Sequence, residues 1–233
     1  MITTSDILFE DNHLIAVNKP AGMLTQKDLT GDTCILDEVK TFLKEKYNKP
    51  GEAFIGCIHR LDRPVSGVIL LAKTSKALER MNIQFREKQT QKKYYAIVKN
   101  KPPKEEDTLV HFLLKNSTKN MSKAHLKEIP HSKRAELDYK VVAKSDNFFL
   151  LEIVLKTGRH HQIRAQLSAI GCPIKGDLKY GFPRSNDDGN ISLHSFYLSF
   201  NHPVKNEMMT IISLPKGKDE LWDYFITGPM DKK

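Results

Sequence analysis

The 233-residue sequence lacks any apolar run long enough to cross a membrane. A membrane-spanning helix needs roughly 18 consecutive apolar residues, whereas the apolar run 68–72 is only strand-sized and ends at Lys73. Residues 1–10 have neither the basic start nor the apolar stretch of a secretory signal. We therefore expect a protein of the cytoplasm that makes no contact with membranes.

Cysteine is also scarce. The three cysteines, Cys34, Cys57 and Cys172, are odd in number and widely spaced, and none belongs to a CxxC pair. This excludes a disulfide framework and the usual spacing of a zinc site. A zinc-dependent base deaminase, which needs such a CxxC pair, is excluded as well. We expect free thiols in a reducing compartment.

The common enzyme signatures are missing. The chain has no GxxxxGK phosphate loop, no GxGxxG turn, no GxSxG elbow and no HExxH motif. The segment His59-Arg60-Leu61-Asp62 resembles a kinase catalytic loop, but the glycine-rich loop and DFG segment of a kinase are absent. We therefore expect no nucleotide cofactor and no metal.

Positive charge is present in excess and is unevenly distributed. Lys and Arg number 37 against 28 Asp and Glu, which gives a formal net charge of +9. Segment 73–104 holds ten basic and two acidic residues, and segment 115–134 holds six and one. Such segments attract a phosphate backbone and speed encounter with it. They favour a nucleic acid partner, although a solvated lysine-rich surface is the alternative for either segment alone.

Hydrophobic periodicity predicts an α+β protein. A turn at Asp11-Asn12 separates two short apolar runs, and helical spacing begins after Asp32 or Thr33, the predicted N-cap. Strands outnumber helices and most are joined by short loops, so the sheet should be largely antiparallel. The predicted strands are 7–9, 14–17, 68–72, 94–98, 109–114, 135–142, 148–155, 193–200 and 208–214. The predicted helices are 35–47, one from near Ser75, 160–170 and 219–225, and segments 99–107 and 183–190 are predicted surface loops.

One polar turn places a carboxylate beside a rigid element. Residues 59–67 read HRLDRPVSG, so that Asp62 lies between Arg60 and Arg63 just before the buried strand. A loop carboxylate next to a strand is a suitable place for chemistry. On spacing alone, an aspartate in a surface ion pair is the alternative interpretation.

Two further clusters carry reactive side chains. Residues 157–164 read TGRHHQIR, and the helical spacing of His161, Arg164 and Leu167 puts Arg164 on a semi-buried face, where it needs an acidic partner. Asp62 is a candidate, because an arginine within about 4 Å would keep a carboxylate ionised for nucleophilic attack. In KKYYAIV, residues 92–98, neighbouring tyrosines point to opposite faces of a strand, and simple packing is the alternative role for Tyr94.

Together these segments resemble the RluA-type RNA pseudouridine synthases over nearly the whole chain. Each match is weak by itself, but their order and spacing are those of the family. In chain order they are 17–22 (VNKPAG), 59–73 (HRLDRPVSGVILLAK), 92–98 (KKYYAIV), 156–181 (KTGRHHQIRAQLSAIGCPIKGDLKYG), 193–195 (LHS) and 201–203 (NHP).

The resemblance implies the pseudouridine synthase fold, with flanking helices and a central catalytic cleft, in a single catalytic domain over 1–233 without a separate N-terminal RNA-binding module. It implies Asp62 as the essential aspartate, Tyr94 as the tyrosine that stacks on the target base and Arg164 as the partner of the aspartate. Arg60 is expected to help open the RNA. His161 and Lys92 are two further expected substrate-binding residues.

Some residues match architectural positions of the family pattern, and a few residues differ from that pattern. Gly67, Gly158 and Gly176 match turn glycines, and His194 matches a structural or cleft-lining position. Pro64 and Val65 stand where many relatives have Asp and Thr, and His160 stands where many have Thr. These departures bear on substrate contacts rather than on catalysis.

The resemblance implies an isomerase that converts uridine to pseudouridine in transfer RNA, ribosomal RNA or both, as a monomer and without a cofactor. Asp62 would either attack the anomeric carbon of the ribose or remove a proton from the neighbouring carbon, and the sequence leaves both routes open. The competing interpretation is a non-catalytic RNA-binding protein or RNA chaperone on the same scaffold.

Overall fold

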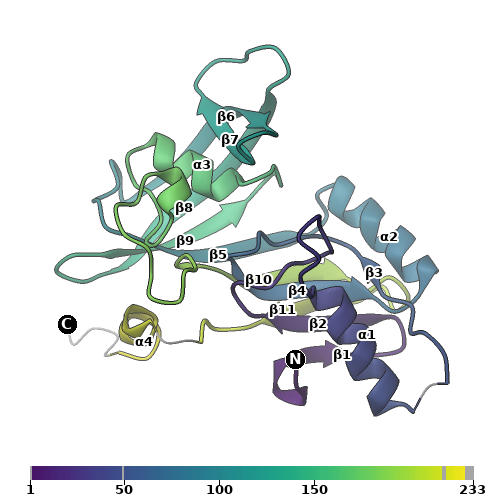
Figure 1. Cartoon of the computed structure of the whole chain (residues 1–233). Coiled ribbons are helices and arrows are strands. Elements are labelled where there is room, and N and C mark those ends of the chain that lie inside the picture. The colour runs from purple at the N-terminus through teal and green to yellow at the C-terminus, as the bar shows by residue number, and fades with distance from the viewer. Residues whose placement is uncertain (1, 49, 217–218, 229–233) are drawn as a thin grey trace. The chain divides into compact units, whose positions relative to one another are not determined.

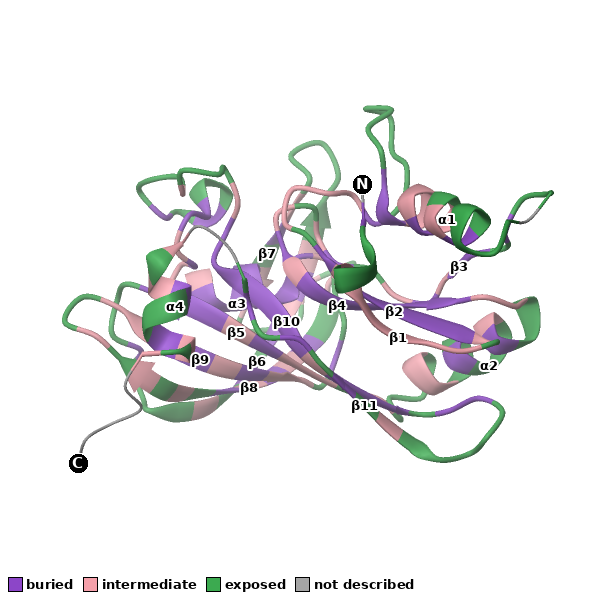
Figure 2. Ribbon diagram, turned by 90° about the horizontal axis from the view of Figure 1, so that it is seen from below, coloured by how far each residue is buried: buried purple, intermediate pink, exposed green. Residues whose placement is uncertain are grey.

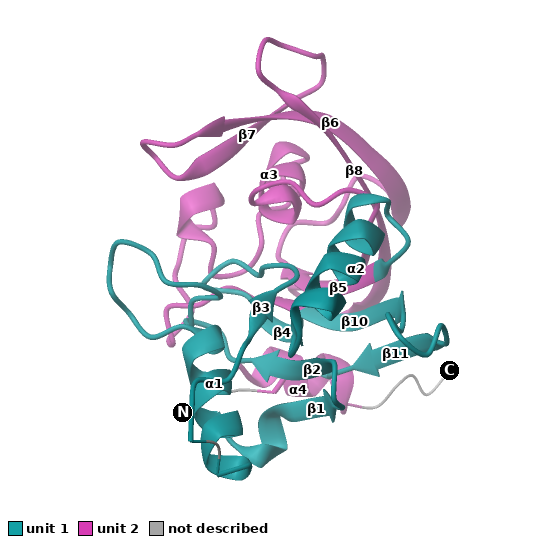
Figure 3. Cartoon of the chain, turned by 90° about the vertical axis from the view of Figure 1, so that its right-hand side faces the viewer, with its two compact units in different colours: residues 1–91, 195–214 teal, residues 92–194, 215–233 magenta. Residues whose placement is uncertain are grey.

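The computed structural model describes residues 2–48, 50–216 and 219–228 (Figure 1). These residues fall into two compact units, each assembled from segments distant in the sequence. The first unit contains residues 1–91 and 195–214, and the second contains 92–194 and 215–233 (Figure 3). The expected single catalytic domain over 1–233 stays a prediction.

The first unit is a sheet with two helices. The hairpin of β1 (Ile7–Glu10) and β2 (Leu14–Lys19) pairs through β2 with β4 (Ser66–Ala72), and both pairings are antiparallel. β10 (Leu193–Asn201) lies next to β4 and pairs antiparallel with β11 (Met208–Ile212). The remaining elements are the two-residue strand β3 (Gly56–Cys57), a 3-10 turn at Thr4–Asp6, and the helices α1 (Ile35–Lys46) and α2 (Ser75–Arg86).

The core of this unit forms around β4, which is buried along nearly its whole length. α2 lies against this core through Ala77 and Met81, and Thr74 caps the helix by accepting a hydrogen bond from the Ala77 N–H at 3.2 Å. At Gly67 φ is +114°, and a Cβ there would lie 2.2 Å from the Ser195 carbonyl oxygen. Only glycine therefore allows the backbones to approach this closely, which confirms the architectural role predicted for Gly67.

The second unit is an antiparallel sheet with the strand order β5-β9-β8-β6-β7. Figure 2 shows more buried and less buried residues alternating along β8, the pattern of a sheet with one face in a core. The strands are β5 (Gln91–Val98), β6 (Glu106–Asn116), β7 (Met121–His125), β8 (Lys133–Lys144) and β9 (Phe149–Leu155). The helical elements are α3 (Gln162–Ala169), a 3-10 turn at Leu178–Tyr180, and α4 (Glu220–Ile226).

Two clusters of buried side chains attach the helices of this unit to its sheet. α3 contacts β6 and β7, and Ala165 packs with Leu113, Ala135 and Tyr180. In the second cluster, Trp222 and Phe225 of α4 pack against Ile97 and Leu150. None of the helices in the described ranges is long and apolar enough to cross a membrane.

The predicted α+β class and the predicted antiparallel strand pairing are confirmed. The predicted N-cap of α1 is wrong, because Cys34 rather than Asp32 or Thr33 holds that position, without a side-chain cap. The sequence also did not reveal β7, whose residues MSKAH lack a repeated apolar alternation. β7 forms because β6 offers it a pairing edge, from Phe112↔His125 to Asn116↔Met121.

Candidate active site

Asp62 lies in the loop between β3 and β4 of the first unit, as the motif predicted. Its side chain is half-buried, whereas Arg60 and Arg63 are exposed. The Asp62 carbonyl oxygen accepts a hydrogen bond from the Val65 N–H at 3.0 Å, which closes a tight turn. The loop thus leaves one carboxylate within reach of solvent on an otherwise fixed backbone.

His59 ties the start of this loop to the sheet. Its Nε2 accepts a hydrogen bond from the Leu70 N–H at 3.0 Å, and its ring stacks on Phe85 with the centroids 4.9 Å apart. Because Nε2 accepts, we assign the proton of a neutral His59 to Nδ1. The histidine of the motif therefore has a structural role in joining the loop to β4 and α2.

Lys19 is a fully buried lysine beside the same loop. Its Nζ donates to the carbonyl oxygens of Met23 at 2.8 Å, Pro20 at 3.0 Å and Arg63 at 3.3 Å. Burial lowers the pKa of the Lys19 ammonium to about 7, and the negative charge of Asp62 opposes this shift. The motifs predicted no separate role for Lys19, although a lysine that ends a buried apolar strand is an unusual residue for that position.

Arg164 is buried in α3 of the second unit, and its acidic partner there is Asp177. Its Nε lies 2.7 Å from Asp177 Oδ2 and its Nη2 lies 2.8 Å from Oδ1, so the pair is bidentate. The guanidinium also lies over the Tyr180 ring, 4.9 Å from the centroid. The need for an acidic partner is confirmed, but the sequence did not single out Asp177. The pairing of Arg164 with Asp62 stays a prediction.

His161 precedes α3 in the left-handed conformation, with φ +52°. Its Nδ1 lies 3.0 Å from the Tyr180 hydroxyl and its Nε2 lies 3.2 Å from Arg164 Nη1. Burial and then the charge of Arg164 lower the pKa of His161 to about 2. The imidazole is therefore neutral, and because a guanidinium only donates, we assign its proton to Nδ1.

The hairpin of β6 and β7, which carries much of the second basic segment, is fastened to this cluster. The Tyr180 hydroxyl accepts a hydrogen bond from the Ser122 N–H at 2.8 Å. The His160 ring stacks on His161 at 3.8 Å and bonds Ser122 Oγ at 2.9 Å and Asn120 Oδ1 at 3.1 Å. The histidine that departs from the family pattern thus holds the hairpin against the start of α3.

Of the two predicted substrate residues of β5, Tyr94 is buried and Lys92 is half-buried. Tyr94 is 6% exposed and Tyr95 is half-buried, and they point to opposite faces of the sheet as predicted. Burial lowers the pKa of Lys92. The Lys92 Nζ lies close to Gly158, since a Cβ placed on this glycine would be 3.5 Å from it. His194 is buried against the Trp222 ring with the centroids 6.3 Å apart, in agreement with a structural role.

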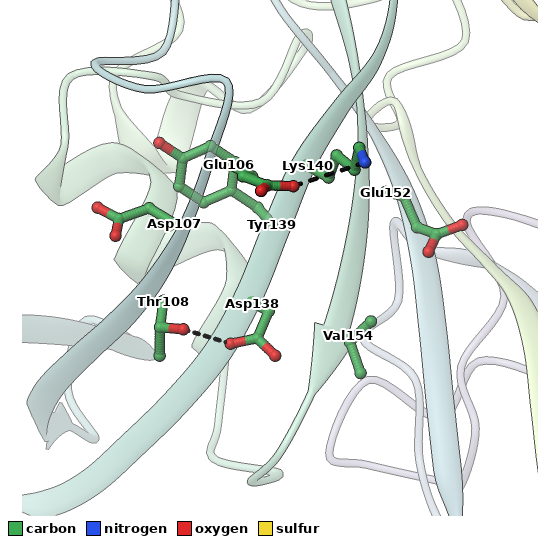
Figure 4. Close-up of a pocket in the computed structure, with 8 residues that line it drawn as sticks. All are labelled: Glu106, Asp107, Thr108, Asp138, Tyr139, Lys140, Glu152 and Val154. Atoms are coloured by element: carbon green, nitrogen blue, oxygen red, sulfur yellow. Dashed lines mark hydrogen bonds and ion pairs between the residues drawn. The ribbon is translucent and has the colours of Figure 1, made fainter.

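A pocket of about 500 Å³ opens on the exposed face of β6, β8 and β9 (Figure 4). Its charged lining is mainly acidic, with Lys140 Nζ 3.5 Å from Glu106 and Thr108 bonded to Asp138 at 2.7 Å. The lining residues are Glu106, Asp107, Thr108, Asp138, Tyr139, Lys140, Glu152 and Val154. None of the six predicted site residues lines it, and its carboxylates would repel a phosphate backbone. Within the described ranges, no group of three or more His, Cys, Asp or Glu side chains is arranged to hold a metal ion.

Comparison with known proteins places this chain in a family. The family model for RNA pseudouridylate synthase matches residues 13–169. The ribosomal large subunit pseudouridine synthase C of Rickettsia prowazekii is 38% identical over 181 residues, which cover 77% of this chain and 57% of that protein. This chain therefore spans little more than half the length of that relative. The tRNA pseudouridine synthase C of Pasteurella multocida is 32% identical, and the alignment covers 94% of this chain and 93% of that protein.

Solved structures give the same fold. The human RNA pseudouridylate synthase domain containing 4 protein matches with a TM-score of 0.79 at 23% identity, over 95% of this chain and 92% of that one. The human domain containing 1 protein matches with a TM-score of 0.69, also at 23% identity, over 91% and 83%. The resemblance described from the motifs is thus confirmed, and the chain belongs to the RNA pseudouridylate synthase family.

Proposed function

We propose that this protein isomerises uridine to pseudouridine in structured RNA, with Asp62 as the catalytic carboxylate. Membership of the family supports the reaction. The observation that carries the assignment is the loop at 59–65, which presents the half-buried Asp62 carboxylate from a backbone hydrogen-bonded on both sides. A protein on this scaffold that only bound RNA would have no need for a carboxylate on so firmly held a backbone.

The reaction rearranges bonds within one nucleotide. The bond from ribose C1′ to uracil N1 breaks, the bond from C1′ to C5 forms, the hydrogen on C5 leaves as a proton, and N1 takes up a proton from solvent. Asp62 either attacks C1′ or removes the proton on C2′, and both routes need an ionised carboxylate. Because all other atoms stay within the nucleotide, the stoichiometry calls for no cofactor.

Substrate binding is assigned to the remaining site residues. The target nucleotide must leave its stack, which costs a few kcal/mol, and stacking on Tyr94 would return about 1–3 kcal/mol. Arg60, which is exposed in the Asp62 loop, is the residue that we expect to enter the opened stack. Arg164 and Lys92 supply donors for the detached base or for the phosphates of the RNA. His161, which is neutral, is a further substrate-binding residue of this proposal.

The proposed substrates are transfer RNA, ribosomal RNA or both. Relatives named for each class are similar to this chain, and its net charge of +9 suits a polyanion. We place segment 115–134 in contact with the phosphate backbone, and we expect the protein to work as a monomer in the cytoplasm.

Carbodiimide mapping of pseudouridine in total RNA tests the proposal. Cells with the gene deleted would be compared with cells that carry the intact gene or the Asp62→Asn variant. Sites that vanish on deletion and return only with the intact aspartate would identify the reaction, the carboxylate and the RNA together. If every site survives deletion and the purified protein modifies no RNA, the synthase proposal fails and a non-catalytic RNA-binding protein replaces it.

A further inference from the structure

The residues on either side of Asp62 are held by one turn about forty positions earlier in the chain. This turn, residues 19–25, follows β2 and belongs to the same unit as the Asp62 loop. Its contacts reach Leu61 and Arg63, the two immediate neighbours of the aspartate. A turn that grips both neighbours of a reactive side chain constrains the direction of that side chain.

Thr25 makes the contact on the N-terminal side. Its side-chain hydroxyl donates to the Leu61 carbonyl oxygen at 2.9 Å and accepts from the Leu61 N–H at 3.2 Å. Both residues are buried, Thr25 at 5% and Leu61 at 6% exposure. A buried peptide group must find a partner, and a single hydroxyl can satisfy both groups because it donates one hydrogen bond and accepts others.

The contacts on the C-terminal side come from the backbone of the turn and from Lys19. The Gly22 N–H donates to the Arg63 carbonyl oxygen at 2.8 Å, and Arg63 Nε donates back to the Gly22 carbonyl oxygen at 3.0 Å. Lys19 Nζ reaches the same Arg63 carbonyl at 3.3 Å. Together with the turn closed by the Val65 N–H, these bonds fix the backbone of Leu61, Asp62 and Arg63. The bonds to Leu61 come from the Thr25 side chain, which a substitution can change without altering the backbone of the turn.

We propose that Thr25 is a positioning residue for the isomerisation, whose hydroxyl holds the Leu61 peptide and so sets the direction of the Asp62 carboxylate. This inference rests on the proposed function. Thr25 touches no reacting atom in this scheme; it acts through the backbone. Misplacing a reactive group by about 1 Å through a remote mutation lowers a rate by up to roughly 100-fold, so the hydroxyl should affect the chemical step rather than the affinity for RNA.

The test compares Thr25→Val, which keeps the shape but loses the hydroxyl, with Thr25→Ser, which keeps the hydroxyl. The probe is total RNA from cells lacking the gene, labelled with tritium at uridine C5, because isomerisation releases that hydrogen to water. With enzyme in excess, the maximal single-turnover rate reports chemistry, and the enzyme concentration for half-maximal rate reports binding. Ser145→Ala is the matched control, since the Ser145 hydroxyl likewise bonds both the N–H and the carbonyl of one residue, Phe148.

We expect the maximal rate of Thr25→Val to fall roughly 10- to 100-fold, while half-saturation stays within about twofold. Thr25→Ser should keep the rate within about threefold, and Ser145→Ala should leave both quantities unchanged. Amide hydrogen exchange adds a readout without activity: the Leu61 amide should exchange at least about tenfold faster in Thr25→Val than in wild type, because its acceptor is gone. If the valine variant does not fold, Thr25→Ala replaces it.

A Thr25→Val enzyme as fast as wild type, or a Leu61 amide that exchanges at the wild-type rate, would overturn the positioning role. So would a serine variant as slow as the valine variant. A wild-type protein that releases no tritium from any RNA is a different failure, visible without any Thr25 variant, and it would remove the proposed function and this inference with it.

Discussion

Arg164 and Asp177 form a buried, bidentate ion pair within the second unit, at N–O distances of 2.7 and 2.8 Å. Both side chains are at most 5% exposed. The carboxylate fixes the plane of the guanidinium, since two parallel hydrogen bonds permit one orientation. Asp177 thus decides how the predicted substrate-binding arginine is presented.

Breaking this pair should be costly. In Asp177→Asn the arginine stays buried without its counter-charge, and removing one partner of a buried pair typically costs about 3–5 kcal/mol. Urea unfolding would measure the decrease in stability. Asp107→Asn, which breaks the partly exposed Lys104–Asp107 pair at 3.1 Å, is the control and should cost under about 1 kcal/mol. Equal decreases for the two variants would contradict the importance of the buried pair.

Asp62→Asn should abolish pseudouridine formation while the protein folds and binds RNA normally. The neutral amide can neither attack a carbon nor remove a proton, so we expect the rate to fall on the order of 10³-fold or more. Tritium release measures the rate, and filter binding measures affinity for the same RNA. A variant that keeps a tenth or more of the activity would require a different catalytic group.

The neutral state of His161 should make the protein sensitive to acid. Its pKa is about 2 in the folded state against an ordinary value of 6.5, so below pH 6.5 only the unfolded chain takes up the proton. The native state therefore loses up to about 1.4 kcal/mol per pH unit from this group as the pH falls from 6.5.

The variant His161→Asn tolerates the left-handed backbone and cannot titrate. The stability difference between wild type and variant, from urea unfolding at pH 7 and pH 5, should therefore shrink by roughly 2 kcal/mol at the lower pH. A difference that does not change with pH would place the folded pKa of His161 near its ordinary value.

Lys19 should produce a pH dependence of the same sign on the alkaline side, with stability rising as the pH rises. Its pKa is lowered to about 7 in the folded state from an ordinary 10.5. The free-energy cost of burying the charged ammonium is therefore fully present below pH 7. It is relieved as the pH rises towards 10.5, because only the unfolded chain stays protonated there. Relative to Lys19→Met, the wild type should gain about 1.4 kcal/mol per pH unit between pH 7 and 10, measured by urea unfolding. A flat difference would place the folded pKa near its ordinary value.

The β6–β7 hairpin should bind the phosphate backbone of the RNA. Replacing Lys115, Lys119 and Lys123 with glutamine should weaken RNA binding and reduce the slope of log affinity against log salt by about 0.7–0.9 for each phosphate that is no longer neutralised. Lys104, Lys140 and Lys144 provide the matched control, and Lys140 lines the acidic pocket of Figure 4. If the first triple variant keeps the wild-type slope, the hairpin does not bind phosphate.

Elements with a clear local pattern of apolar residues were predicted from the sequence, and elements without such a pattern were missed. β4 has a run of apolar residues and was predicted, because burial of that run requires a core. β7 has no such run, and it is a strand because β6 supplies a pairing edge and α3 covers it. The N-cap of α1 failed for a related reason: Ile35 N–H bonds the Leu24 carbonyl oxygen at 2.8 Å, so a distant residue sets where the helix begins.

The sequence by itself determined the family of this protein and the residues proposed to carry its chemistry, since the motif around Asp62 and those containing Tyr94 and Arg164 are contiguous in the chain. Only the tertiary structure decided how those groups are held. Asp177 is the partner of Arg164, and Thr25 holds Leu61, because folding brings these backbones together and excludes water from the contacts. Burial is a property of the whole packed unit, so a neutral His161 cannot be read from its neighbours in the chain.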